Sequence, residues 1–210
     1  LLTTIAYRIN GKTTYAMEGS IFIAGAGVQW LRDKMKFFKR APETEKIVKS
    51  LKDNNNIYLV PAFTGLGAPY WDANARGVLS GITRDTSPKE IVRATIEAVA
   101  YQTFDLFEAM KHDGLRPKIV KVDGGMVMNN WFSQFLSDIV NVKVLRPKVQ
   151  ETTALGAAFM AGLHIGVYKS LKDISKNWHL DKNFSPKMKN PLRNKLLKGW
   201  SAAIKKTLSN

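Results

Sequence analysis

The chain has 210 residues and a mass of 23.5 kDa, which suits one large domain or two small ones. Its 45% hydrophobic and 23% charged residues are typical of a folded globular protein and exclude a disordered one. The absence of cysteine excludes disulfide scaffolds, thiolate metal sites and cysteine nucleophiles, and predicts a reducing, cytoplasmic compartment. No apolar run reaches the roughly 18 residues that a membrane helix requires. No secretory signal opens the chain, which begins with Leu1, so we expect its true start upstream.

The net charge of +15 raises the hypothesis of a nucleic-acid or acidic-membrane partner. Residues 30–52 carry +5 and residues 169–210 carry +9, whereas residues 53–168 sum to zero. The neutral middle holds the unusual motifs, and no nucleic-acid-binding motif is recognisable in the sequence. We therefore expect no nucleic-acid partner and no membrane, with a basic nucleic-acid-binding module as the minor alternative.

The chain predicts an opening hairpin followed by alternating strands and helices, with no internal repeat. The expected strands are residues 1–9 and 13–17, joined by Asn10-Gly11, an extended segment at 21–24, and strands at 57–63, 119–122 and 142–145. The expected helices are one with Val28, Leu31 and Met35 on one face, a surface pair within 36–56, and others at 87–111, from about 126 to 139, at 152–167 and from 192. Ser87-Pro88-Lys89-Glu90 combines a capping box with a proline at the first helical position. The alternation indicates an α/β fold with a mixed sheet flanked by helices, and one domain, with the basic tail packed on it or extending from it.

The strongest candidate for a binding site is Val122-Asp123-Gly124-Gly125-Met126, at the junction of a strand and a helix. Adjacent glycines let the backbone approach a ligand without a Cβ between them. The helix that follows would direct unpaired N–H groups at a phosphate, and Asn129 and Asn130, one turn inside it, can add side-chain amides. The alternative is a tight turn, which is the commoner meaning of a lone glycine pair.

A second candidate is Ala24-Gly25-Ala26-Gly27-Val28-Gln29, also read as strand into helix. It lacks the third glycine of a Rossmann dinucleotide site and the Gly-Lys-Ser/Thr of a Walker A loop. The alternative is a set of small residues where a helix packs on a sheet. Two glycine-bearing junctions in one domain can form opposite walls of one nucleotide cleft, and this combination is more informative than either junction alone.

The remaining polar motifs have structural interpretations. Within the loop Gly65–Arg76, we expect Asp72 and Arg76 to pair and pin the loop. Glu151-Thr152-Thr153 is expected to cap a helix. The histidines lack the spacing of metal ligands, so no metal site is predicted; they are His112, His164 and His179.

Several of these segments together resemble the FGGY carbohydrate kinases. They are Thr64–Asp72 with Ala75-Arg76-Gly77, Arg93–Glu97 with Ala100-Tyr101-Gln102, Val122–Gly125, and Glu151–Ala158. Three others resemble most the members that phosphorylate glycerol: Leu1–Ala6, Tyr15–Gly19 and Gln29–Asp33. The resemblance implies an actin-like, ribonuclease-H-like nucleotide-binding domain at residues 1–170, incomplete at its N-terminus. A basic linker and helix at 171–210 match only loosely.

The resemblance also implies that the chain supplies the ATP-binding half of a cleft in which ATP with Mg²⁺ phosphorylates glycerol. The family's nucleotide contacts fall on Gly25, Gln29, Gly125 and Asn129, and Gly124 and Asp123 would support the loop. These positions agree with the two glycine-bearing junctions identified above. The family's catalytic aspartate and polyol contacts lie upstream of the chain, so no catalytic residue is expected on it and the isolated chain is expected to be inactive. The implied partners are the N-terminal domain of the same enzyme and further copies in a homo-oligomer. A pentulose kinase of the same family is the alternative enzyme.

Overall fold

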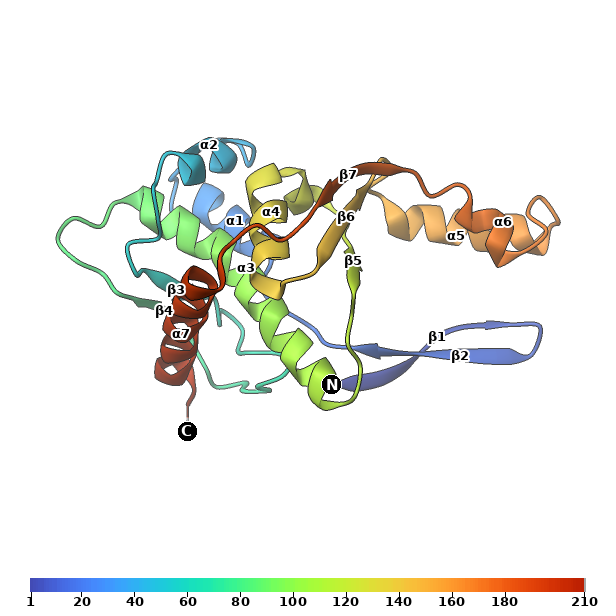
Figure 1. The fold of residues 1–210 in the computed structure, drawn as a ribbon, viewed down its shortest axis with the longest axis horizontal. Coiled ribbons are helices and arrows are strands. Elements are labelled where there is room, and N and C mark those ends of the chain that lie inside the picture. Colours follow the sequence, from blue (N-terminus) through green and yellow to red (C-terminus); the bar gives the residue numbers. More distant parts are fainter. Residues whose placement is uncertain (210) are drawn as a thin grey trace.

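A long central helix organises the rest of the chain in the structure, a computed structural model that describes residues 1–209 (Figure 1). The helices are α1 (Gly25–Asp33), α2 (Glu43–Lys49), α3 (Pro88–His112), α4 (Asn130–Val140), α5 (Thr152–His164), α6 (Leu171–Ser175) and α7 (Asn190–Thr207). The strands are β1 (Leu2–Ile9), β2 (Lys12–Glu18), β3 (Tyr58–Val60), β4 (Val78–Ser80), β5 (Ile119–Lys121), β6 (Lys143–Pro147) and β7 (Leu180–Phe184). Residues Gly125–Met128 form a 3₁₀ helix, called here the 125–128 turn.

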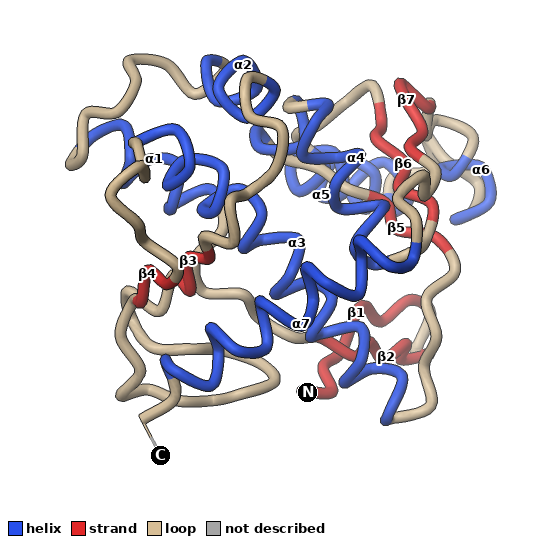
Figure 2. The backbone as a smooth tube through the Cα atoms, turned by 60° about the vertical axis from the view of Figure 1, so that its left-hand side comes forward, coloured by secondary structure: helices blue, strands red, loops and turns tan. Residues whose placement is uncertain are grey.

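The strands form three small sheets. In the hairpin β1–β2, Asn10 and Gly11 both have positive φ, 50° and 77°, as a two-residue turn between antiparallel strands requires. β3 and β4 are antiparallel, and β6 pairs in parallel with β5 and antiparallel with β7, which is the predicted mixed sheet. Figure 2 shows β3–β4 and the three-stranded sheet on opposite sides of α3. The α/β prediction is confirmed.

Helix α3 begins where the sequence predicts. The backbone N–H of Lys89 donates to the Ser87 hydroxyl at 3.2 Å, and the backbone N–H of Ser87 donates to the Glu90 carboxylate at 3.0 Å. The two bonds satisfy groups that a helix terminus otherwise leaves unpaired, and Pro88 occupies the first helical position. The predicted 87–111 helix is confirmed to within one residue.

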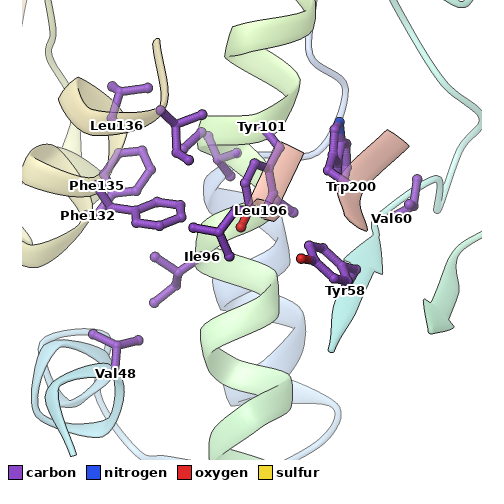
Figure 3. Packing of buried hydrophobic residues seen from close by; sticks show 14 of the residues in the cluster. Val48, Tyr58, Val60, Ile96, Tyr101, Phe132, Phe135, Leu136, Leu196 and Trp200 are labelled. Atoms are coloured by element: carbon purple, nitrogen blue, oxygen red, sulfur yellow. The ribbon is translucent and has the colours of Figure 1, made fainter. Parts of the chain in front are cut away.

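The main hydrophobic core surrounds the middle of α3 (Figure 3). The Tyr101 ring stacks on Trp200 of α7 with centroids 5.2 Å apart, and meets the edge of Phe135 of α4 at 5.6 Å. Tyr58 of β3 joins the cluster, with its ring centroid 5.9 Å from that of Tyr101. The basic tail therefore packs on the domain, because its last helix buries Trp200 in the common core. The division at residue 170 stays a prediction.

A buried polar cluster fixes α3 to the loop before β3. The Glu97 carboxylate has no exposed surface, accepts from Arg93 Nε at 2.7 Å and from the Tyr101 hydroxyl at 2.9 Å, and lies 3.3 Å from the Asn54 amide. Arg93 also donates to the carbonyl of Leu51 at 2.8 Å. Burial raises the pKa of Glu97, and its three donors only partly offset this effect.

Some predicted elements are wrong. Residues 21–24 form no strand: the backbone here is irregular, and its Ile23 carbonyl lies 3.4 Å from the side-chain amide of Gln102 in α3 instead of pairing with another strand. Residues 36–56 hold one helix and not two; the chain turns at Lys36, whose φ is +58°. The linker expected within residues 171–210 contains β7, a largely exposed strand that lacks the apolar alternation by which sequence patterns detect strands.

Two arms project from the same side of the body, the β1–β2 hairpin and the α5–α6 segment (Figure 1). Helix α5 is rich in small residues, which would permit close packing against another helix, but within residues 1–209 most of them are exposed; they include Ala154, Ala157, Ala158 and Ala161. The described chain thus contains no close partner for this face.

Candidate functional site

A cavity of about 350 Å³ lies where α1, α2 and the 125–128 turn meet, beside α3. Four predicted contact residues line it together: Gly25 and Gln29 from α1, and Gly125 and Asn129 from the other junction. The other lining residues are Val28, Arg32, Ala41, Pro42, Thr44, Glu45, Ile96, Met126 and Met128. The two glycine-bearing junctions, distant in sequence, therefore contribute to one cavity, called here the junction pocket.

The two pocket glycines leave open space in the wall. A Cβ on Gly25 or on Gly125 would meet no protein atom within 4 Å. Gly124 is different: its φ of +83° is a conformation that glycine adopts without strain, and its role is to form the turn. A ligand can approach the backbone at Gly25 and Gly125 closely.

The N-terminus of α1 offers donors to this space. Ala24 occupies the N-cap position, and within the described residues no side chain hydrogen-bonds there as a cap. The first-turn N–H groups of a helix have no intrahelical acceptor and carry the positive end of the helix dipole. Because Gly25 is the first residue of α1 and lines the pocket, this end of the helix suits a phosphate.

Asn129 has a different local role from the one predicted. The expectation of a helix starting directly beyond Gly125, with Asn129 and Asn130 one turn inside it, is wrong because the 125–128 turn intervenes. Asn129 is the N-cap of α4: its side-chain oxygen accepts from the Phe132 N–H at 3.0 Å, and its Nδ2 donates to the Thr44 hydroxyl at 3.3 Å. The cap fixes the carboxamide in the pocket wall.

Helix α2 contributes two lining residues that sequence reasoning missed, Thr44 and Glu45. The Glu45 carboxylate accepts from the Asn130 N–H at 3.3 Å and from Lys49 at 2.5 Å. Burial would raise the pKa of Glu45, but the hydrogen bonds from Lys49 and Asn130 outweigh it, and the pKa lies below its usual value. Glu45 is therefore ionised at neutral pH. The contacts of Thr44 with Asn129 and of Glu45 with Asn130 each join residues 85 positions apart, so no local sequence pattern predicts them.

Other predicted sites lie elsewhere. Asp123 is exposed, and neither it nor Gly124 lines the junction pocket; the Gly124 N–H instead approaches the Gln150 carbonyl at 3.4 Å. The predicted Asp72–Arg76 pair is wrong: Arg76 donates to two loop carbonyls, and Asp72 accepts from backbone N–H groups and from Ser209.

The expected side-chain cap on α5 is also wrong. Glu151 occupies the N-cap position, but within residues 1–209 no cap hydrogen bond from its side chain is formed. Across the same residues, no three His, Cys, Asp or Glu side chains gather as a metal site, and no helix is long and apolar enough to cross a membrane.

A larger hollow of about 1000 Å³ lies between the two projecting arms. Its lining includes Tyr7 and Arg8 from the hairpin and Met160 and His164 from α5. It contains none of the residues predicted to bind a ligand, so the smaller junction pocket is the better candidate site.

Comparison with known proteins gives a consistent result. The profile of the FGGY family of carbohydrate kinases, C-terminal domain, matches residues 3–165. The glycerol kinase 1 of Pseudomonas aeruginosa is 56% identical over 209 residues, which are 100% of this chain and 42% of the relative. The glycerol kinase of Alcanivorax borkumensis is 56% identical over 97% of this chain and 41% of its own length. The chain thus spans about two fifths of the length of the curated relatives it matches.

Solved structures match the fold as well. A Plasmodium falciparum glycerol kinase with ADP superposes with a TM-score of 0.89 at 38% identity, covering 100% of this chain and 42% of that one. A ligand-bound xylulose kinase from Lactobacillus acidophilus gives a TM-score of 0.76 at 25% identity, over 93% of this chain and 40% of that one. These matches support the predicted actin-like, ribonuclease-H-like fold.

Proposed function

This chain belongs to the FGGY family of carbohydrate kinases, and on that premise we propose that it forms the nucleotide-binding part of an enzyme that phosphorylates glycerol with ATP. The observation that carries the proposal is the meeting of Gly25, Gln29, Gly125 and Asn129 in one cavity. The glycerol kinases among the relatives support glycerol as the acceptor. The weaker match to a xylulose kinase makes a pentulose kinase the second candidate.

The pocket has the features that a nucleotide requires. Phosphoryl transfer depends on positioning the nucleotide and on stabilising the charge of the moving phosphoryl group. Backbone N–H groups at Gly25 and at the 125–128 turn would bind phosphate oxygens, and the open space at the two glycines admits them. Gln29 and Asn129 would add carboxamide donors. Asp123 and Gly124 would act only through the shape of the loop.

We propose that Mg²⁺ enters with the nucleotide. Among residues 1–209, no three His, Cys, Asp or Glu side chains gather into a group that could hold the ion by itself. A hard cation of this kind is commonly held by one or two carboxylates together with substrate phosphates.

The catalytic base and the polyol contacts would be provided by the N-terminal domain of the same enzyme, the principal proposed partner. We also propose that the enzyme is cytoplasmic, which the cysteine-free composition supports. We further propose that it forms a homo-oligomer, as the resemblance to the family implies. Residues 171–210 would be an added segment that completes the domain, because β7 extends its sheet and α7 its core.

Calorimetric titration of the 210-residue chain with ADP and with ATP–Mg²⁺ tests the nucleotide role, and saturable one-site binding is expected. The absence of binding would overturn the proposed nucleotide role.

Glycerol and xylulose turnover by the longer protein that carries this chain tests the acceptor, and glycerol is expected to be preferred. The chain alone, with glycerol and ATP, is expected to show no turnover; steady turnover would overturn the half-cleft proposal.

A further inference from the structure

A buried arginine contacts the 125–128 turn without lining the junction pocket. We propose that Arg146 is a positioning residue, which together with Asp181 holds this turn in the conformation that binds the nucleotide. The inference rests on the proposed function, because it takes the ligand of the pocket to be a nucleotide.

The contacts of Arg146 reach the turn directly. It lies on β6 and is only 6% exposed. Its Nη1 donates to the Val127 carbonyl at 2.8 Å and approaches the Met128 carbonyl at 3.4 Å, while its Nε donates to Asp181 at 2.7 Å. The planar guanidinium can serve these acceptors together, which an ammonium group cannot do with the same geometry.

The turn needs support from outside. It is a single 3₁₀ turn, preceded by Gly124 and begun by Gly125, and within the described chain no side chain caps its start. Met126, Met128 and Asn129 line the pocket, whereas Val127 points into the core and is 5% exposed. Arg146 does not line the pocket, so its hydrogen bond to the Val127 carbonyl supports the turn from outside the space open to a ligand. The Ser133 hydroxyl donates to the same carbonyl at 2.9 Å.

The buried charge of Arg146 also gives a reason for an acidic residue in the basic C-terminal segment. A buried guanidinium is costly unless a charged partner compensates it. Asp181 of β7 is that partner, and it is one of only two acidic residues in the basic segment 169–210, the other being Asp173. The strand that sequence patterns missed thus supplies the acid that holds the arginine in place.

Arg193 provides a matched control. It is a partly buried arginine whose Nε donates to the Ile139 carbonyl at 2.7 Å, and whose guanidinium lies over the Phe104 ring at 5.2 Å. It holds a carbonyl of α4 at the end of the helix away from the pocket. Arg193→Met therefore removes the same kind of bond without touching the turn.

The test uses the 210-residue chain and the variants Arg146→Met, Arg146→Lys, Asp181→Asn and Arg193→Met. Two properties are measured: the ADP dissociation constant, and amide hydrogen exchange at Asn129 and Phe132 without nucleotide. Arg146→Met is expected to weaken ADP binding about tenfold, the usual effect of losing a charged hydrogen bond, and to accelerate exchange at both amides. Arg146→Lys is expected to restore part of both properties, and Arg193→Met to leave both at the parent values.

The proposal would be overturned if Arg146→Met kept the parent's ADP dissociation constant and amide exchange rates. It would also be overturned if Arg193→Met weakened ADP binding and accelerated amide exchange as much as Arg146→Met does. If Arg146→Met does not fold, Asp181→Asn decides, since it keeps the guanidinium and removes its anchor; unchanged exchange and affinity in that variant would overturn the proposal. If the parent itself binds no ADP, the proposed function fails, and the exchange comparison still decides the role of Arg146.

Discussion

The indole N–H of Trp200 in α7 donates a 2.7 Å hydrogen bond to the Asp105 carboxylate in α3. Trp200 is 1% exposed and stacks on Tyr101, so the last helix is fixed to the centre of the domain by both a polar and an aromatic contact. Burial raises the pKa of Asp105 to about 6, although Trp200 and the Tyr70 hydroxyl act to lower it.

The shifted pKa of Asp105 predicts a pH dependence of stability. The folded-state pKa of about 6 lies above the ordinary value of 3.8, so the folded state binds this proton more tightly than the unfolded state does. The stabilising contribution of Asp105 to the unfolding free energy is therefore fully present below about pH 4 and is lost as the pH rises through 6. Asp105→Asn keeps an oxygen for Trp200 but does not titrate. The unfolding free energy of the parent minus that of Asp105→Asn is therefore expected to fall by about 2–3 kcal/mol between pH 4 and pH 7.

Urea unfolding at both pH values measures this difference. Asp85→Asn, at an exposed position, is the control, and its difference from the parent is expected to stay constant. A constant difference for Asp105→Asn as well would contradict the role of Asp105.

Trp200→Ala is expected to destabilise the chain by about 3–5 kcal/mol, because it removes a fully buried aromatic side chain and leaves a cavity beside Tyr101. Trp178→Ala is the matched control. Trp178 is half-buried near the surface with the Lys121 ammonium 4.3 Å from its ring, and its loss is expected to cost about 1 kcal/mol. Equal losses in urea unfolding would show that α7 is not part of the cooperative core.

Local signals in the sequence predicted the elements that depend on local chemistry. Asn10-Gly11 determines the hairpin turn, and Ser87 with Glu90 determines the start of α3, because each feature is completed within four residues. The sequence also predicted that Gly25 and Gly125 would line one cleft, because each lies in a glycine-bearing junction expected to lead from a strand into a helix.

The rest of the site depends on contacts between distant segments. The Thr44 hydroxyl meets Asn129 across 85 positions, and Arg146 meets Asp181 on a strand whose residues are mostly exposed. Neither pair has a periodic pattern or a fixed spacing, so only the packed fold reveals them. Asn129 shows why a local reading was incomplete: its N-cap bond depends on where the 125–128 turn ends.

Methyl groups added at the pocket glycines are expected to weaken nucleotide binding without destabilising the fold. A Cβ on Gly25 or Gly125 meets no protein atom, so Gly25→Ala and Gly125→Ala place a methyl in open pocket space where a nucleotide is proposed to lie. We expect ADP affinity to fall about tenfold, for a steric cost of about 1.4 kcal/mol. Unfolding free energies are expected to stay equal to the parent's or to rise slightly.

Gly156→Ala is the control for these two variants. A Cβ on Gly156 also meets no atom within 4 Å, but Gly156 lies in α5, outside the pocket. It is expected to leave ADP affinity unchanged and to stabilise the helix by about 0.5–1 kcal/mol. ADP binding at the parent's affinity by Gly125→Ala would argue against a ligand in this wall of the pocket.

Two substitutions of Asn129 are expected to separate its structural role from its binding role. Asn129→Asp keeps an oxygen that accepts from the Phe132 N–H and adds a negative charge at a helix N-terminus, so stability is expected to be retained. It loses the donor to Thr44 and places a carboxylate where phosphates are proposed to bind, so ADP affinity is expected to fall about tenfold or more. Asn129→Ala loses the cap as well, and is expected to lower both the affinity and the unfolding free energy, the latter by about 1 kcal/mol. If Asn129→Asp binds ADP as the parent does, its side chain serves only the cap, and the pocket must hold the nucleotide through α1 and the turn backbone.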